Sequence, residues 1–376
     1  MDRKTRARRA LALLLLASGA CASSSPMRVG SERLNRAEAA LARGRAGEAI
    51  SMLDGNVGDS IRGSKLLGRA YLDVGDPERA RENLARALRI DPSDPETYRI
   101  YGEACERDRF FDRAIDSYRR ALAVRHDDAD AARRLAVLLA DLGRSAEAAE
   151  ALREAARLLP DDLEIRHRLG VVELERGRDE EAESAFDLVL ARGGPSAPAF
   201  LGRGVARARR FVESRPASGP ADGLASAEAD FLEAMRLAVD DPAPPYDLGW
   251  VRELRADRAG AEDAYRFALE RDPNHLQATL RLAVLLDERR ALPEALVLYR
   301  RAQAATSDPR IKKALADRVL TLERGGDPEA PTDSASPGSP TGSASPGSPT
   351  GSAPPGSPTG SAPSESAPRD RPPSRE

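Results

Sequence analysis

The stretch PETYRIYGEACERDRFFDRAIDSYRRALAVRHDD, residues 95–128, contains the pattern that decides the fold of this chain. Its eighth residue is small, and a small residue returns at the same place in each flanking unit. Five of these residues are separated by 34 positions, and two more follow after one longer gap: Gly68, Gly102, Ala136, Gly170, Gly204, Gly249 and Ala283. A period of this length predicts an array of repeats rather than separate globular domains.

Two further positions recur in the same register. Twelve residues after the first small residue, or 23 in the one longer unit, another small residue follows: Ala80, Ala114, Ala148, Ala182, Ala227, Ala261 and Ala295. Four residues later comes a large apolar side chain: Leu84, Tyr118, Leu152, Phe186, Phe231, Tyr265 and Tyr299. The pattern predicts two antiparallel helices per unit, because Gly or Ala at a crossing lets two backbones approach while the large side chain fills the space beside them. We expect Asp94 to cap such a helix and Pro95 to occupy its first position.

This pattern resembles the tetratricopeptide repeat (TPR). The resemblance implies an all-α fold, a solenoid of helical hairpins wound into a right-handed superhelix, and it extends over residues 30–324. The predicted units are 30–60, 61–94, 95–128, 129–162, 163–196, 197–241, 242–275 and 276–309. Residues 310–324 are expected to form the cap helix that solenoids require, with one apolar face made of Ile311, Leu315, Val319 and Leu322.

One unit breaks the register, since Gly204 and Gly249 are 45 residues apart instead of 34. The extra 11 residues fall within residues 211–222, which include Pro216, Gly219 and Pro220. We expect them to form a longer loop between the paired helices, either as a tolerated surface insertion or with a function of its own.

The N-terminus has the organisation of an export signal. Residues 2–9 are basic, an apolar run over Leu11–Leu16 follows, and small residues precede Cys21. We predict a signal peptide over residues 1–20, a tether over 21–29 and a lipid attached to Cys21, because residues 16–21 resemble a bacterial lipobox. Ordinary signal cleavage is the alternative, because residues 20–22 read Ala-Cys-Ala. The residue after Cys21 is not Asp, so the resemblance implies an exported chain anchored in the outer membrane and facing the periplasm.

The other cysteine, Cys105, has no partner if Cys21 carries lipid, and its place in the repeat predicts a buried small side chain.

Residues 325–376 form a tail of low complexity. The nonamer SASPGSPTG starts at Ser334, returns at Ser343 and recurs from Ser352 with one Ser changed to Pro. Because the tail lacks aromatic residues, we predict that it is disordered. Three roles remain open for the tail: it is an inert extension, it is glycosylated, or it lies against the cell wall.

The chain lacks sequence signals for catalysis. Its three histidines, His126, His167 and His275, have no metal-ligand spacing, and no catalytic or phosphate-binding motif is present. Signal, array and tail account for the whole chain. We therefore predict that it is not an enzyme and uses no cofactor and no metal. His126 and His275 fall in turns between units and are expected to be exposed. With 58 Lys and Arg against 61 Asp and Glu, the chain has no basic excess, which argues against a nucleic-acid partner.

In the TPR family the first helix of each unit lines a concave groove, and ligands meet its positions 2, 5, 9 and 12. We consider positions 5 and 9. The corresponding partner-groove residues here include Lys65, Arg69, Arg99, Arg133, Val137, His167, Val171, Val205, Tyr246, Trp250 and Val284. Position 9 is charged in the first two 34-residue units and apolar in the next five, which predicts a polar mouth and an apolar floor around Tyr246 and Trp250. Either a partner peptide lies there, or position 9 only packs against the neighbouring helix. Truncation of Trp250 separates the two, since a core residue loses stability and a groove residue loses binding.

Chaperone-binding TPR domains hold a C-terminal carboxylate with a specific set of residues. Lys65 and Arg134 match that set, but Arg69, Ile100 and Asp130 do not, so we do not expect this chain to bind such a carboxylate.

The sequence predicts a non-enzymatic scaffold in the bacterial cell envelope that binds protein or peptide partners. A pilotin-like factor for assembly of an outer-membrane secretin or pilus, and a regulatory subunit of an envelope enzyme, are the alternatives.

Overall fold

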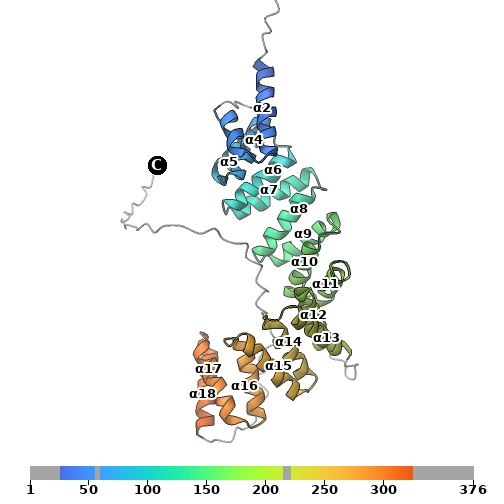
Figure 1. The fold of residues 1–376 in the computed structure, drawn as a ribbon, viewed down its shortest axis with the longest axis vertical. Coiled ribbons are helices and arrows are strands. Elements are labelled where there is room, and N and C mark those ends of the chain that lie inside the picture. The colour runs from blue at the N-terminus through green and yellow to red at the C-terminus, as the bar shows by residue number, and fades with distance from the viewer. Residues whose placement is uncertain (1–25, 56–59, 215–221, 325–376) are drawn as a thin grey trace, which may run out of the picture. The chain divides into compact units, whose positions relative to one another are not determined.

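The computed structural model describes residues 26–55, 60–214 and 222–324. The predicted signal peptide, Cys21 and the tail lie outside the described residues. Within these ranges the chain forms helices α2 to α18 and no β-strand. Figure 1 shows these helices in chain order, from α2 in blue to α18 in orange.

The helices alternate between a first and a second helix in each unit. The first helices are α2 (Pro26–Ala42), α4 (Ile61–Asp73), α6 (Pro95–Arg107), α8 (Ala129–Asp141), α10 (Leu163–Glu175), α12 (Ala197–Ser214), α14 (Ala243–Leu254) and α16 (Leu276–Glu288). The second helices are α3 (Ala46–Leu53), α5 (Pro77–Ile90), α7 (Phe111–Val124), α9 (Ser145–Leu158), α11 (Asp179–Gly193), α13 (Asp222–Leu237), α15 (Arg258–Arg271) and α17 (Leu292–Ala305). A single helix, α18 (Pro309–Glu323), follows the last pair.

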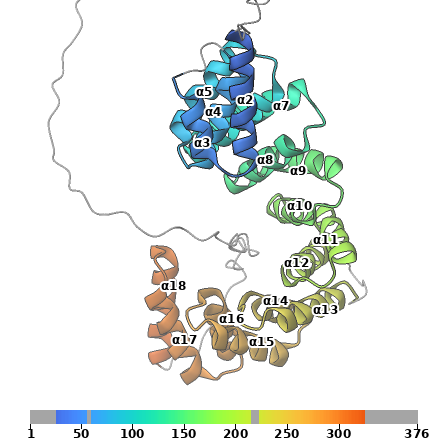
Figure 2. The same cartoon turned by 45° about the horizontal axis from the view of Figure 1, so that its top comes forward.

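Each helix packs on its chain neighbours, as a solenoid requires. Each first helix packs on the second helix of its own unit, and that second helix packs on the next first helix (Figure 2). Several first helices also touch the first helix of the next unit, as in α4 with α6, α8 with α10 and α12 with α14. Successive second helices make no comparable contacts within the described part of the chain. The first helices therefore line the more closely packed side of the array.

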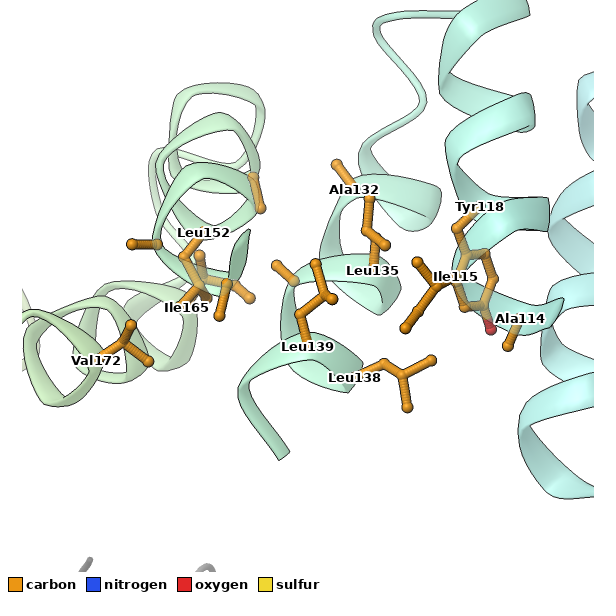
Figure 3. Close-up of a cluster of buried hydrophobic side chains, with 14 of the residues drawn as sticks. Ala114, Ile115, Tyr118, Ala132, Leu135, Leu138, Leu139, Leu152, Ile165 and Val172 are labelled. Carbon is orange, nitrogen blue, oxygen red and sulfur yellow. The ribbon is translucent and has the colours of Figure 1, made fainter. Parts of the chain in front are cut away.

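The recurrent small residue makes room for a side chain. A Cβ added to Gly102 would lie 2.6 Å from the Tyr118 ring, and one added to Gly249 would lie 2.5 Å from the Tyr265 ring. The sequence pattern predicted a close approach of two backbones, and the structure shows that the large residue of the second helix lies against the glycine. Figure 3 shows how the core continues between units, with Tyr118 facing the α8 side chains beside it.

Helix ends follow the sequence closely. The prediction for Asp94 and Pro95 is confirmed: the Asp94 carboxylate accepts a hydrogen bond from the Glu96 N–H, and Pro95 is the first residue of α6. Asp128 and Asp162 cap α8 and α10 in the same way. At the start of the array the structure differs from the prediction, because α2 begins at Pro26, inside the segment predicted as a tether. Proline is well suited to a first helical position, where no N–H is required.

The insertion is only partly a loop. The predicted loop began at Phe211, but α12 continues to Ser214. Phe211 and Val212 pack against the core cluster of this unit, and this burial favours the extra helical turn. The remaining insertion residues, 215–221, lie outside the described residues.

The cap helix and the cysteine were predicted largely correctly. Leu315 and Val319 of α18 are buried against the last unit. Ile311 is 40% exposed, because it lies in the first turn of α18, beyond the end of α17. Cys105 is fully buried, as predicted, and forms no disulfide among the residues that the structure describes.

Candidate partner-binding face

The predicted partner residues lie on successive first helices, from Lys65 on α4 to Val284 on α16. We call the side of the first helices that carries positions 5 and 9 of each unit the groove face, with position 1 at residues 61, 95, 129, 163, 197, 242 and 276. The charges and apolar side chains on this face are distributed unevenly along the array.

The position-5 cations of the early units are paired with acids of the next unit. The Lys65 Nζ lies 2.7 Å from Asp94 Oδ2 and also pairs with Glu96. Arg133 pairs with Asp162 at 2.9 Å and with Glu164 at 2.8 Å. The acid at the end of each of these early units is thus both a helix cap and an ion-pair partner.

These pairs are partly desolvated. Burial alone would raise the pKa of Asp94, but hydrogen bonds from Lys65 and Thr97 outweigh it and lower the pKa. Arg99 approaches Asp128 to 4.0 Å in the same arrangement. Arg69 differs, since it is exposed and reaches only Asp73 on its own helix, at 3.6 Å.

Position 6 carries a second set of cations, which the sequence analysis did not consider as a set. Arg134 pairs with Glu103 at 3.2 Å, Arg168 with Asp141 at 2.7 Å, and Arg281 with Glu253 at 3.2 Å. In each pair the acid belongs to the preceding first helix. Lys65 and Arg134, the two residues that match the chaperone-binding pattern, are therefore both engaged within the chain.

A third regularity joins the two helices of a unit. The Tyr118 hydroxyl donates a hydrogen bond to Glu106 at 2.7 Å, and the Tyr299 hydroxyl donates one to Asp287 at 3.2 Å. Burial and the neighbouring carboxylate raise the pKa of Tyr118.

Sequence reasoning missed this pairing, although a signal was available. Position 12 is acidic wherever the large core residue is Tyr, and it is Leu or Ala wherever that residue is Leu or Phe.

The apolar residues predicted at position 9 remain partly accessible. Val137, Val171 and Val205 are each half-buried on successive first helices, and Val284 is 44% exposed. Leu201 and Leu280, at position 5, are half-buried as well. The later units therefore present apolar side chains where the earlier units present paired charges.

The aromatic residues of the predicted floor separate into two kinds. The ring of Tyr246 is half-buried, with its centroid 5.0 Å from that of His275. Trp250 is only 8% exposed and belongs to a core cluster with Leu248 and Val251. The structure therefore assigns Trp250 to packing and leaves Tyr246 on the groove face.

The predicted exposure of His275 is wrong. Its Nδ1 accepts a hydrogen bond from the Ala278 N–H and caps α16, and burial lowers its pKa. A cap at the start of a first helix lies between two units and is partly covered by both. His126 is exposed, as predicted, and His167 lies edge-on to Phe186 with centroids 5.6 Å apart.

One groove-face residue that sequence reasoning missed is Asp247, at position 6 of α14. It occupies the place that Arg134, Arg168 and Arg281 occupy in other units. The signal was a reversal of charge at one position of the repeat.

Within residues 26–55, 60–214 and 222–324, no group of His, Cys, Asp and Glu side chains is arranged to hold a metal ion. Among the same residues, no helix combines the length and the apolar character that crossing a bilayer requires.

A model of the tetratricopeptide repeat matches residues 65–129, 106–163, 134–198 and 246–309, which together make up more than half of the chain. The chain belongs to the tetratricopeptide repeat family. A TPR array is a protein–protein interaction scaffold, and TPR proteins are generally non-catalytic.

Solved structures agree with this fold. The C-terminal part of a TPR protein from Cytophaga hutchinsonii is 15% identical, with a TM-score of 0.52, over 65% of this chain and 97% of that one. A TPR protein from Parabacteroides merdae is 18% identical, with a TM-score of 0.47, over 70% and 100%. YrrB, described as a TPR protein with an unusual peptide-binding site, is 17% identical, with a TM-score of 0.45, over 53% and 96%. No curated protein matches the chain.

Proposed function

We propose that this TPR protein is a non-enzymatic scaffold that binds a segment of a partner protein along its groove face. The observation that carries the proposal is the row of incompletely buried valines at position 9: Val137, Val171, Val205 and Val284. Contiguous apolar side chains left accessible on a folded surface are typical of interaction sites.

The early part of the groove face supports a different role. Lys65 and Arg133 already pair with acids of the next unit, so a charged ligand would have to compete with these pairs. The apolar residues of the later units have no such competition. A partner segment that lies across α8 to α16 would gain apolar burial at each unit it crosses, at about 25 cal/mol per Å².

Photo-crosslinking in intact cells tests the proposal. A photoreactive residue at Val205 or Val284 should capture a defined partner, because both positions lie on the groove face. The matched control is Val297, which is 63% exposed on the second helix α17. Equal capture from all three positions, or capture only from Val297, would contradict binding on the groove face.

We also propose that the protein acts in the bacterial cell envelope, exported by residues 1–20 and anchored by a lipid on Cys21. The basic residues, the short Leu run and the small residues before Cys21 support this proposal. Palmitate labelling of the wild type and of Cys21→Ser tests it. Labelling should be lost in the variant, and an unlabelled wild type would contradict the anchor.

The identity of the captured partner separates the remaining alternatives. Capture of a secretin subunit, together with unassembled secretin in a deletion strain, would indicate a pilotin-like factor. Capture of an envelope enzyme whose rate changes on binding would indicate a regulatory subunit.

A further inference from the structure

Asp247 is the acidic residue at position 6, where three units carry arginine and the others carry Leu66, Ile100 and Gly202. Arg134, Arg168 and Arg281 each pair with an acid of the preceding first helix. Asp247 stands at the same position of α14, and its carboxylate forms no hydrogen bond or ion pair with any residue that the structure describes.

The preceding helix offers Asp247 no cation. The acids that pair with Arg134, Arg168 and Arg281 stand at positions 9, 13 and 12 of the preceding first helix, where α12 has Val205, Arg209 and Ala208. The Arg209 guanidinium donates to the Leu174 carbonyl oxygen at 2.9 Å and pairs with Asp179 at 3.2 Å.

The other cations nearby are engaged as well. On α12 itself, Arg203 and Arg207 reach Asp230 of the second helix α13. On the following side, Arg281 pairs with Glu253. Arg271 of α15 donates at 2.6 Å to the backbone carbonyl oxygen of Asp241.

The charge that does act on Asp247 is unfavourable. Burial and, after it, the negative charge of Asp241 raise the pKa of Asp247 to about 7. A half-buried carboxylate without a partner lowers the stability of the free protein. Where a chain departs from its own repeating pattern at a cost in stability, a functional reason is expected.

The first helices α12, α14 and α16 carry partly accessible apolar side chains on the groove face. Leu201 lies on the preceding first helix, Tyr246 is the neighbouring residue, and Val284 lies on the following first helix. An occupant of this part of the groove face thus meets apolar side chains and one unneutralised negative charge.

We propose that the groove face of α12, α14 and α16 binds a partner segment that places a Lys or Arg against Asp247 and apolar side chains against Leu201, Tyr246 and Val284. This inference rests on the proposed function and adds the chemistry of the partner to it. The basic residue is required because it gives Asp247 the ion pair that Arg134, Arg168 and Arg281 form within the chain at the same position. An acidic segment is excluded by repulsion from both Asp247 and Asp241.

The test is a selection of random 12-residue peptides displayed on phage against the full chain in detergent. Three proteins are compared: the wild type, Asp247→Asn, and Asp130→Asn. Asp130 is the matched control, because it is an exposed acid on the first helix α8 without an ion pair among the described residues. Peptides enriched on the wild type should combine apolar residues with a Lys or Arg.

The preference for a basic residue should disappear with Asp247→Asn and persist with Asp130→Asn. One enriched peptide is then synthesised with its basic residue and with Gln in its place. The exchange should weaken binding about tenfold for the wild type and for Asp130→Asn, and less than twofold for Asp247→Asn.

The outcomes separate the two proposals. Two results would overturn the role of Asp247 and leave groove binding intact. The first is enrichment of peptides without a preference for a basic residue. The second is an equal loss of affinity for the wild type and for Asp247→Asn when the basic residue of the peptide is replaced by Gln. Absence of any enrichment on all three proteins would count against groove binding itself.

Discussion

The groove face of α4 to α10 and that of α12 to α16 share one backbone register but handle charge in opposite ways. In the early units, Lys65 and Arg133 pair with acids that also cap the next first helix. In the later units, positions 5 and 9 are apolar, and position 6 carries the Arg281–Glu253 pair and the unpaired carboxylate of Asp247. The comparison teaches that equivalent positions of a repeat serve either to stack the units or to meet a partner.

The early pairs have a structural function. A cation between two units holds the cap of the next helix in place, and the pair is partly shielded from solvent. At position 6 of α14, where the units of α8, α10 and α16 carry a paired arginine, an unpaired carboxylate weakens the array and leaves one charge available. The following changes test this comparison, beginning with the largest expected effect.

Trp250→Ala should lower the free energy of unfolding by about 3–5 kcal/mol, because it removes a large buried side chain from the core cluster of the later units. Urea unfolding followed by circular dichroism measures the change. Val284→Ala is the control on the groove face and should cost less than about 1 kcal/mol. A loss below about 1 kcal/mol for Trp250→Ala would contradict its assignment to the core and assign it to the groove face.

Asp247→Asn should increase stability at pH 8, in contrast to most losses of a charge. The pKa of Asp247 in the folded protein, about 7, is raised above that of an unfolded Asp, about 3.9. The penalty is therefore absent below pH 4, develops as the pH rises, and is complete above pH 7. For this partly exposed side chain we expect a gain of about 1–2 kcal/mol at pH 8 and none at pH 4. Thermal unfolding at both pH values measures it, and a loss at pH 8 would indicate that Asp247 already has a partner.

Asp94→Ala should lower the free energy of unfolding, in contrast to Asp247→Asn. It removes a helix cap and the partner of Lys65, which together stabilise the array by about 1–2 kcal/mol. Because the pKa of Asp94 is lowered in the folded protein, this contribution is present at pH 7 and declines as the solution is acidified. Denaturant unfolding at pH 7 and at pH 3 measures it. An unchanged stability at pH 7 would contradict the structural function assigned to the early pairs.

Ala256→Gly should give the smallest effect, a gain of about 0.5–1 kcal/mol. Ala256 lies in the turn between α14 and α15 with φ 59°, and the equivalent residue of an early unit is Gly75, with φ 81°. Glycine adopts this left-handed conformation without strain. The reverse substitution, Gly75→Ala, should lower stability by a similar amount. A loss of stability in Ala256→Gly would mean that the methyl group makes a contact outweighing the strain.

Much of the fold was predictable because its signals are periodic. The spacing of Gly102 and Tyr118, repeated in each unit, indicated both helices and their contact. Less predictable were the features that depend on two units at once. Whether Trp250 faces the core or the groove depends on how closely α12 and α14 approach, and the end of α12 depends on burial of Phe211.

The site was predictable only in part, for a similar reason. Positions 5 and 9 could be numbered from the sequence, but their ion pairs reach into the next unit. Asp247 stands out only once position 6 of three other units is known to carry paired arginines. Its signal is a departure from the chain's own pattern, which comparison of the repeats with one another can reveal.

The most direct measurement is the pKa of Asp247 in the free protein and in the complex, from the carboxyl ¹³C chemical shift followed with pH. The account predicts a value near 7 in the free protein and a fall below 4 when a basic peptide selected on the wild type is bound. A value near or below 4 in the free protein would contradict it, because the carboxylate of Asp247 would then be solvated, as in an unfolded chain, or already paired within the chain.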